Sequence, residues 1–132
     1  MSERPDGLMQ LQHVALNVPD VCACERFYRR ILGMQLVWRP DEGNVYLTNG
    51  TDNLALHHAP AVEMSTAQRL DHLGFSLAHE GDVDTWDDYL TAQGVPIVAA
   101  PRTHRDGARS LYCEDPAGNI VQLLHDPRVG RR

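Results

Sequence analysis

The sequence of 132 residues has few cysteines, no long apolar run and no excess of basic residues. Its three cysteines, Cys22, Cys24 and Cys113, lack the spacing of a disulfide framework, so a reduced, cytoplasmic protein is expected. No segment approaches the roughly 18 apolar residues of a membrane span, and residues 1–7 contain no apolar stretch typical of a secretory signal. The formal net charge of −6 argues against a nucleic-acid partner, because phosphate backbones repel an acidic domain.

The remaining composition is ordinary, with 42% hydrophobic and 23% charged residues. These shares are typical of a globular protein and exclude a disordered or fibrous chain. A chain of this length suits a single domain, which we place at residues 8–127. No glycine-rich phosphate loop is present. The residues that stand out for chemistry are seven histidines: His13, His57, His58, His72, His79, His104 and His125.

Apolar periodicity and turn residues predict one order of elements that occurs twice. In the first half, a strand over 9–18 precedes a helix over 21–32 and strands over 34–39, 44–47 and 53–58. The second half repeats this with a strand over 70–78, a helix over 83–93 and strands over 95–100, 110–113 and 119–124. The halves are module 1, about residues 8–59, and module 2, about residues 70–127, joined by a linker over 60–69. Such an internal repeat predicts two similar β-α-β-β-β units.

The repeat places His13 and His72 at equivalent positions, each the third residue of a similar segment and 59 residues apart. Two first strands related by a pseudo-twofold axis would direct both imidazoles into one shared cleft. Imidazoles brought together from distant positions are typical of a metal site. The alternative is that each is a hydrogen-bonded strand histidine without a ligand.

The last predicted strand follows the turn Asp115-Pro116-Ala117-Gly118-Asn119. Together with the two halves and the paired histidines, this motif resembles the vicinal oxygen chelate superfamily, from residue 8 to about 127. The resemblance implies an α+β fold in which two βαβββ modules form curved four-stranded mixed sheets around a cleft. Members include glyoxalase I, fosfomycin-resistance thiol transferases, extradiol dioxygenases, methylmalonyl-CoA epimerases and bleomycin-resistance binding proteins. Because their modules close within one chain or across two, the resemblance also implies a homodimer.

The resemblance implies metal ligands, but this chain departs from the usual set. Metal-using members carry a Glu where this chain has Gln122, and glyoxalase I-like members carry another where it has Ala55. His57, two residues beyond Ala55 on the same strand face, is a substitute, and a one-residue change of register would select His58 instead. The implied set is His13, His72, Gln122 and His57. Without a carboxylate it predicts weak binding of a divalent ion such as Zn, Fe, Mn or Ni.

A second similarity concerns His104 and Tyr112, which precede the Asp-Pro turn as in extradiol dioxygenases and fosfomycin-resistance proteins. It implies that both are catalytic, with the Tyr112 phenol acting as a proton donor. The alternatives are a solvated loop histidine and a tyrosine that belongs to the core. On the alternation of the strand, Tyr112 and Ser110 share the face predicted to line the cleft. Ser110 has no base near it in the sequence, so it is not expected to be a nucleophile.

Three further residues are candidates for binding the substrate. Trp38 and Tyr46 lie on predicted strands of module 1, where they line the cavity or pack in the core. Arg109 suits an anionic substrate, with a surface role as the alternative.

Two functions remain open from the sequence. The first, which we favour, is a metal-dependent enzyme acting on vicinal oxygens, either a glyoxalase-like lyase or isomerase or a ring-cleaving dioxygenase. The second is a metal-free protein that binds a small molecule, as bleomycin-resistance proteins do. The absent carboxylates favour binding, whereas the paired histidines and Tyr112 favour catalysis.

Overall fold

The computed structural model describes residues 4, 6, 10–60 and 70–128. Module 1 contains β1 (His13–Val18), α1 (Val21–Arg26), a π-helical turn η1 (Phe27–Ile31), β2 (Gln35–Asp41), β3 (Asn44–Thr48) and β4 (Asn53–His58). Module 2 contains β5 (Leu73–Ser76), α2 (Asp82–Ala92), β6 (Ile97–Thr103), β7 (Arg109–Glu114) and β8 (Ile120–His125). The predicted order of strands and helices in each half is confirmed. The expected linker falls almost entirely at 61–69, outside the described residues.

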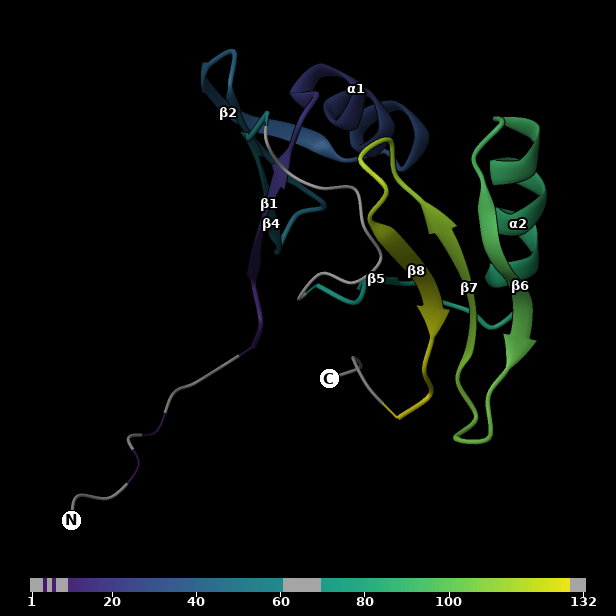
Figure 1. Ribbon diagram of the computed structural model, residues 1–132. Coiled ribbons are helices and arrows are strands. Elements are labelled where there is room, and N and C mark those ends of the chain that lie inside the picture. The colour runs from purple at the N-terminus through teal and green to yellow at the C-terminus, as the bar shows by residue number, and fades with distance from the viewer. Residues whose placement is uncertain (1–3, 5, 7–9, 61–69, 129–132) are drawn as a thin grey trace.

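Each module forms one four-stranded mixed sheet, as predicted, with the order β1-β4-β3-β2 in module 1 and β5-β8-β7-β6 in module 2. The first strand of each module runs parallel to its last strand, and the other pairs are antiparallel. In Figure 1, α1 covers one sheet at the top of the molecule and α2 runs along β6 and β7 of the other. Among the described residues, no helix has the length and apolar character needed to cross a bilayer.

The helices pack on the apolar face of each sheet, and one hydrophobic core includes residues of both modules. Strand alternation places Val45 and Leu47 of β3 in this core, both fully buried. The ring of Tyr28 in η1 lies 6.3 Å from the ring of Phe75 in β5, measured between centroids. Module 1 therefore packs against module 2 through its helical segment.

A buried hydrogen-bond network crosses the same contact. The Tyr28 hydroxyl donates to Asp115 Oδ2 at 2.7 Å, in the turn between β7 and β8. Asp115 Oδ1 also accepts from the backbone N–H groups of Ala117 and Asn119, at 2.9 and 2.8 Å. The Asn119 side chain donates to Asp115 Oδ2 at 2.9 Å. These four donors stabilise a carboxylate in the core that no described cation neutralises.

The helix of module 1 differs from the expected α-helix over 21–32. It begins as predicted, with the Asp20 carboxylate accepting from the Ala23 N–H at 3.0 Å. The α-helix then ends at Arg26 and continues as the π-turn η1, in which the Leu32 N–H donates to the Phe27 carbonyl at 3.1 Å. A π-turn accommodates one extra residue per turn, which apolar periodicity does not reveal.

The strand ends also differ from expectation. β1 begins only at His13 and β5 only at Leu73, so His72 precedes its strand. Both strands start where parallel pairing starts, at Asn53 and Val121 respectively. β6 continues through Pro101, which was expected to end it. A register shift between Ala99 and Arg102 on this edge strand accommodates the missing proline N–H.

Candidate functional site

Three side chains predicted for the site meet on the sheet of module 2. Tyr112 of β7 pairs with Gln122 of β8, and Gln122 pairs with Gly74 of β5. The His72 ring stands edge-on to the Tyr112 ring, with 5.4 Å between centroids. We call His72, Tyr112 and Gln122 the module 2 cluster.

Hydrogen bonds within the module 2 cluster leave two polar atoms available. Gln122 Nε2 donates to Tyr112 Oη at 3.0 Å, and the phenol proton has no acceptor among the described residues. His72 Nδ1 donates to Asp71 Oδ2 at 2.6 Å, and in the neutral ring this leaves Nε2 as an acceptor. Tyr112 thus carries a free donor and His72 an acceptor; His72 lines the cavity beside the cluster, whereas Tyr112 contacts it only through Gln122.

Gly74 of β5 leaves open space next to the module 2 cluster. A Cβ atom at Gly74 would lie 3.2 Å from the Leu124 side chain and 3.5 Å from Gln122 Oε1. Because the first contact is tighter than an ordinary van der Waals distance, a larger residue there would displace its neighbours. Gly74 therefore keeps space in front of the Gln122 amide.

A cavity of about 860 Å³ lies beside the cluster, between the modules. Its polar lining consists of His72, Ser76 and Gln122 from module 2 and Gln12, Asn49, Thr51, Asp52 and Asn53 from module 1. Its apolar part comes from both modules and includes Leu32, Met34, Leu54, Phe75 and Trp86. A volume of this size with a few polar groups on an apolar wall is typical of a small-molecule site.

The sheet of module 1 carries the repeat-related positions. Tyr46 pairs with Ala55, as Tyr112 pairs with Gln122, so the register supports the alignment of Ala55 with Gln122. Tyr46 stacks on Trp38 with 5.4 Å between ring centroids, and Trp38 is 59% exposed. The substrate-binding role of Trp38 and Tyr46 stays a prediction.

Two histidines share this face of module 1. His13 Nδ1 donates to Asn53 Oδ1 and His57 Nδ1 to Asn44 Oδ1, each at 2.6 Å. His13 does not line the 860 Å³ cavity, whereas His72 does. The structure thus places the two equivalent histidines on separate sheets, and their common site stays a prediction.

The histidine expected to be catalytic, His104, lies in the turn after β6. Its ring Nε2 atom is 2.7 Å from Ser110 Oγ. The backbone N–H of His104 donates to the Ala108 carbonyl at 2.7 Å. The expectation that Ser110 has no base nearby was wrong, because the β6–β7 hairpin folds His104 back over it. Ser110 is only 1% exposed, so this contact closes the hairpin without presenting a nucleophile to a substrate.

Arg109 forms an ion pair with Asp84 of α2. Its guanidinium donates to both carboxylate oxygens of Asp84, at 3.0 and 2.7 Å. This bidentate hydrogen bonding lowers the pKa of Asp84 and raises that of Arg109. The arginine joins β7 to α2, and its role toward an anionic substrate stays a prediction.

The implied metal set of His13, His72, Gln122 and His57 stays a prediction. Among the described residues, no three His, Cys, Asp or Glu side chains are grouped closely enough to hold a metal ion. The individual imidazoles have ligand character, because His13 and His72 each hold Nδ1 on an oxygen acceptor and leave Nε2 free. Gln122 contributes a carbonyl oxygen in place of a carboxylate. This donor set lacks the carboxylates of the metal site that the resemblance implies, so it does not match that site.

Comparison with known proteins decides the family. A family model, the Glyoxalase/Bleomycin resistance protein/Dioxygenase superfamily, matches residues 10–123. The chain belongs to this superfamily. An uncharacterised protein of Pseudomonas aeruginosa is 31% identical over 91% of this chain and 91% of its own length. A 2-epi-5-epi-valiolone epimerase from an Actinomyces species is 28% identical, over 92% of this chain and 81% of its own.

A solved structure of the superfamily confirms the fold. Lactoylglutathione lyase from Agrobacterium tumefaciens superposes with a TM-score of 0.75 and 22% identity, covering 98% of this chain and 100% of that one. Superfamily membership establishes a protein of the kind that acts on or binds small molecules. It does not decide among the chemistries, because members of one fold differ in their sites.

Sequence reasoning missed the partners that make the module 2 cluster a unit. Asp71 adjoins His72 in the sequence, which was a usable signal for its Nδ1 contact. The Gln122–Tyr112 hydrogen bond had a weaker signal, because it depends on the register of β7 against β8. Gln122, at the position where the resemblance implies a metal-binding Glu, instead donates to a phenol.

Proposed function

We propose that this protein binds an α-hydroxycarbonyl compound at the module 2 cluster and catalyses proton exchange at the hydroxyl-bearing carbon next to the carbonyl. The observation that carries the proposal is the Gln122–Tyr112 hydrogen bond, which leaves the phenol proton free on a ring that meets the His72 ring edge-on, with 5.4 Å between centroids. A carbonyl oxygen accepts from Tyr112, and the neighbouring hydroxyl-bearing carbon presents its hydrogen to His72 Nε2. The apolar wall of the 860 Å³ cavity suits a compact carbon skeleton.

The proposed chemistry follows from the same two atoms. His72 removes the proton from the hydroxyl-bearing carbon, and the electron pair moves to the carbonyl oxygen, where Tyr112 stabilises the enediolate. Water delivers a proton to the opposite face of that carbon, which gives the epimer, and His72 releases to the solvent the proton that it removed. No oxidant is needed, and the similarity to an epimerase agrees with this class of reaction.

The test is exchange of the α-hydrogen for deuterium, followed by proton NMR in D₂O with 2-hydroxycyclohexanone and acetoin. Wild-type protein is expected to accelerate exchange over buffer. Tyr112→Phe should slow it roughly 10²–10⁴-fold, the usual contribution of a positioned acid. Tyr46→Phe is the matched control, because Tyr46 pairs with Ala55 and has no amide to orient it.

The outcomes separate the two functions that the sequence left open. Exchange that survives Tyr112→Phe would remove this residue from the mechanism. Binding by calorimetry without any exchange would instead favour the non-catalytic binding protein. The proposal is refuted if the protein shows no binding and no exchange with any of the hydroxycarbonyl compounds.

A second candidate is a metal-dependent enzyme assembled from two copies of the chain. It is favoured by the free Nε2 atoms of His13 and His72, together with the exposed strand β2, where Leu36, Val37 and Trp38 are 38, 55 and 59% exposed. A homodimer that covers the module 1 sheet could bring these histidines to the partner's cluster. Metal analysis and analytical ultracentrifugation test it, and Gln122→Glu should raise zinc affinity at least tenfold. A monomer whose zinc affinity does not respond to Gln122→Glu excludes this candidate.

A further inference from the structure

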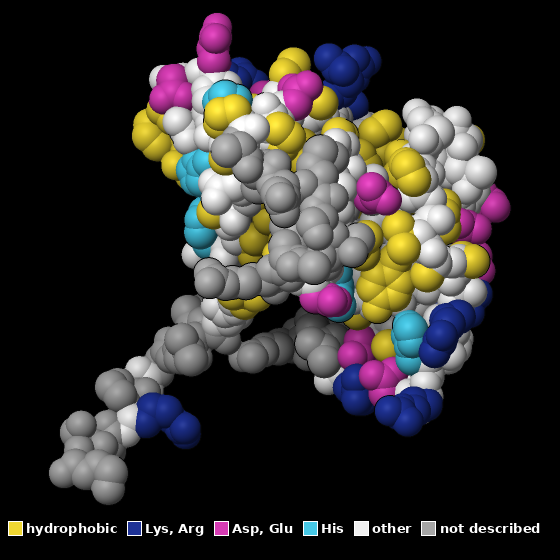
Figure 2. Space-filling view, in the orientation of Figure 1, with side chains coloured by type: hydrophobic (Ala, Val, Ile, Leu, Met, Phe, Trp, Pro, Cys, Tyr) yellow, Lys and Arg dark blue, Asp and Glu magenta, His cyan; other side chains and the backbone are white. Residues whose placement is uncertain are grey.

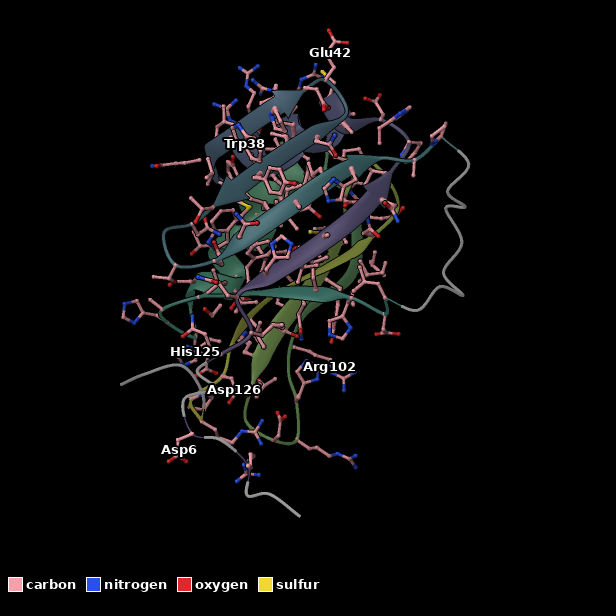
Figure 3. The ribbon with its side chains drawn as sticks, turned by 90° about the vertical axis from the view of Figure 1, so that its left-hand side faces the viewer. Asp6, Trp38, Glu42, Arg102, His125 and Asp126 are labelled. Carbon is pink, nitrogen blue, oxygen red and sulfur yellow. The ribbon has the colours of Figure 1, made fainter. Side chains whose placement is uncertain are left out.

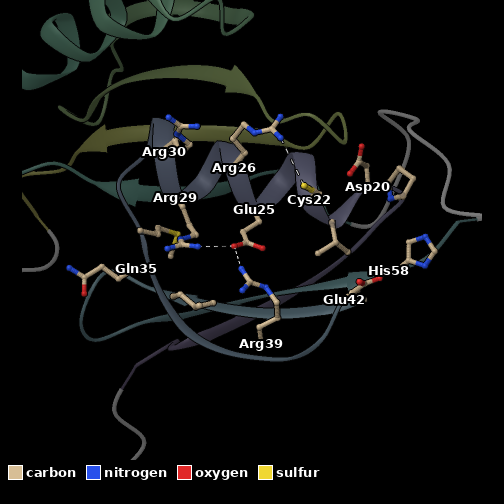
Figure 4. A pocket seen from close by; sticks show the side chains of 15 residues that line it. Asp20, Cys22, Glu25, Arg26, Arg29, Arg30, Gln35, Arg39, Glu42 and His58 are labelled. Atoms are coloured by element: carbon tan, nitrogen blue, oxygen red, sulfur yellow. Dashed lines mark hydrogen bonds and ion pairs between the residues drawn. The ribbon is translucent and has the colours of Figure 1, made fainter.

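A groove of about 1160 Å³ runs between the helical segment α1–η1 and strand β2, and four arginines line it (Figure 4). They are Arg26, Arg29, Arg30 and Arg39. Among the described residues, it shares only Met34 with the cavity beside the module 2 cluster. The groove is therefore separate from that cavity, and its lining is rich in arginine.

The concentration of basic residues is unusual for this chain. The sequence contains no lysine, so its twelve basic residues are all arginine, and its net charge is −6. One third of these arginines gather at this groove, and Figure 2 shows basic side chains at the top of the molecule, over the helix α1 of Figure 1. Guanidinium groups favour bidentate binding of phosphate and carboxylate oxygens.

Two of the arginines are held in place by one acid. Glu25 Oε2 accepts from Arg29 at 2.9 Å and also from Arg39 of β2. Figure 4 shows both guanidinium groups directed at this carboxylate from opposite walls. The Glu25 side chain is only 15% exposed, whereas each arginine side chain remains 41% exposed. Glu25 thus fixes two cations across the groove and neutralises one of them.

The other two arginines lack a carboxylate partner. Arg30 makes no side-chain hydrogen bond or ion pair in the described part of the chain, and the one contact of Arg26 is to the Cys22 sulfur at 4.0 Å. Arg26 is the last residue of α1 and Arg30 lies in the π-turn η1, so both extend from one helical segment. The nearby acid Asp20 already caps the helix, and Glu42 lies beside His58 on the side of the groove away from Arg30 (Figure 4).

We propose that this groove binds a phosphate monoester, with the phosphate at Arg26 and Arg30 and the organic part over Met34 and Leu36. A phosphate monoester carries close to two negative charges near neutral pH, which matches the two guanidinium groups without partners. Its three terminal oxygens accept the paired N–H groups of both arginines. Binding pairs both arginines with an anion, and the apolar floor of the groove contacts the ester carbon chain.

The test is calorimetric titration at pH 8 with octyl phosphate, octanoate and 1-octanol, each below its aggregation concentration. Octyl phosphate is expected to bind at least tenfold more tightly than octanoate, and 1-octanol more weakly than either. The double variant Arg26→Gln/Arg30→Gln should lose at least tenfold in affinity for octyl phosphate. The single variant Arg30→Gln, which removes no contact seen in the structure, should lose several-fold.

The matched control is Arg102→Gln/Arg105→Gln, which removes the same charge from two exposed arginines in module 2. Figure 3 shows Arg102 at the end of the molecule opposite to Glu42, and neither arginine has a side-chain partner among the described residues. This control should bind octyl phosphate as wild type does. The groove variants should also keep wild-type α-hydrogen exchange, which separates this inference from the proposed function. Equal binding of octanoate and octyl phosphate, or unchanged affinity in the double variant, would overturn the proposal.

Discussion

Replacing Tyr28 with Phe tests the hydrogen bond that joins the two modules. The change removes only the hydroxyl that donates to Asp115 Oδ2 at 2.7 Å, inside the core. A hydrogen bond to a charged group contributes about 1.5–3 kcal/mol, and Asp115 retains three other donors, so we expect a loss of about 2 kcal/mol. For a chain of this length, that corresponds to a fall of about 7 °C in the melting temperature.

Urea and thermal unfolding monitored by circular dichroism measure this loss. Tyr89→Phe is the matched control, because the Tyr89 hydroxyl also joins the modules, by donating to the Ile31 carbonyl at 3.1 Å, but its side chain lies at the surface. We expect it to lose less than about 1 kcal/mol. If the two variants are equally stable, burial of the Asp115 charge does not make the Tyr28 bond stronger. In an Asp115→Asn background the effect of Tyr28→Phe should shrink, since the acceptor is then neutral.

Two further predictions concern alkaline pH and a helix end. Burial raises the pKa of Cys24 and of Cys113 to about 12, from an ordinary 9.0, so stability should be complete below about pH 9 and fall toward pH 12. Above pH 9 the free energy of unfolding should fall by about 1.4 kcal/mol per pH unit for each thiol. Urea unfolding at pH 8 and pH 10 should therefore show a smaller fall for Cys113→Ala than for the wild-type protein. Gly94→Ala should destabilise by about 1 kcal/mol because Gly94 has a φ of 77°, whereas Gly81→Ala, at ordinary φ and with open space for its Cβ, should not. Equal melting temperatures for these two alanine variants would contradict the strain argument.

The order of elements was predictable because each boundary has a local cause. Turns rich in Gly, Asn and Asp separate the strands, and Asp20 caps the first helix as its position suggested. The repeat strengthened the prediction, since each half supports the other. The last strand carried the family motif, and the family model matches residues 10–123.

The contacts of the candidate site were less predictable, because they depend on register and on packing between elements. Register shifts interrupt the pairing of β6 with β7, so alternation alone does not determine which side chain faces Ser110. The ion pair of Arg109 joins it to Asp84, 25 residues earlier on another element. Neither relation is encoded in a local pattern of residues.

The parallel pairing of first and last strands has a consequence for synthesis on the ribosome. In module 2, Leu73 pairs with Val121, 48 residues later, so β5 emerges with its apolar side chains and has no partner until β8 follows. At about 5–20 residues per second, this interval lasts several seconds. During it, module 1 is already complete in sequence and offers Tyr28 as a surface for Phe75. The first module to be translated is thus placed to shield the unpaired strand of the second.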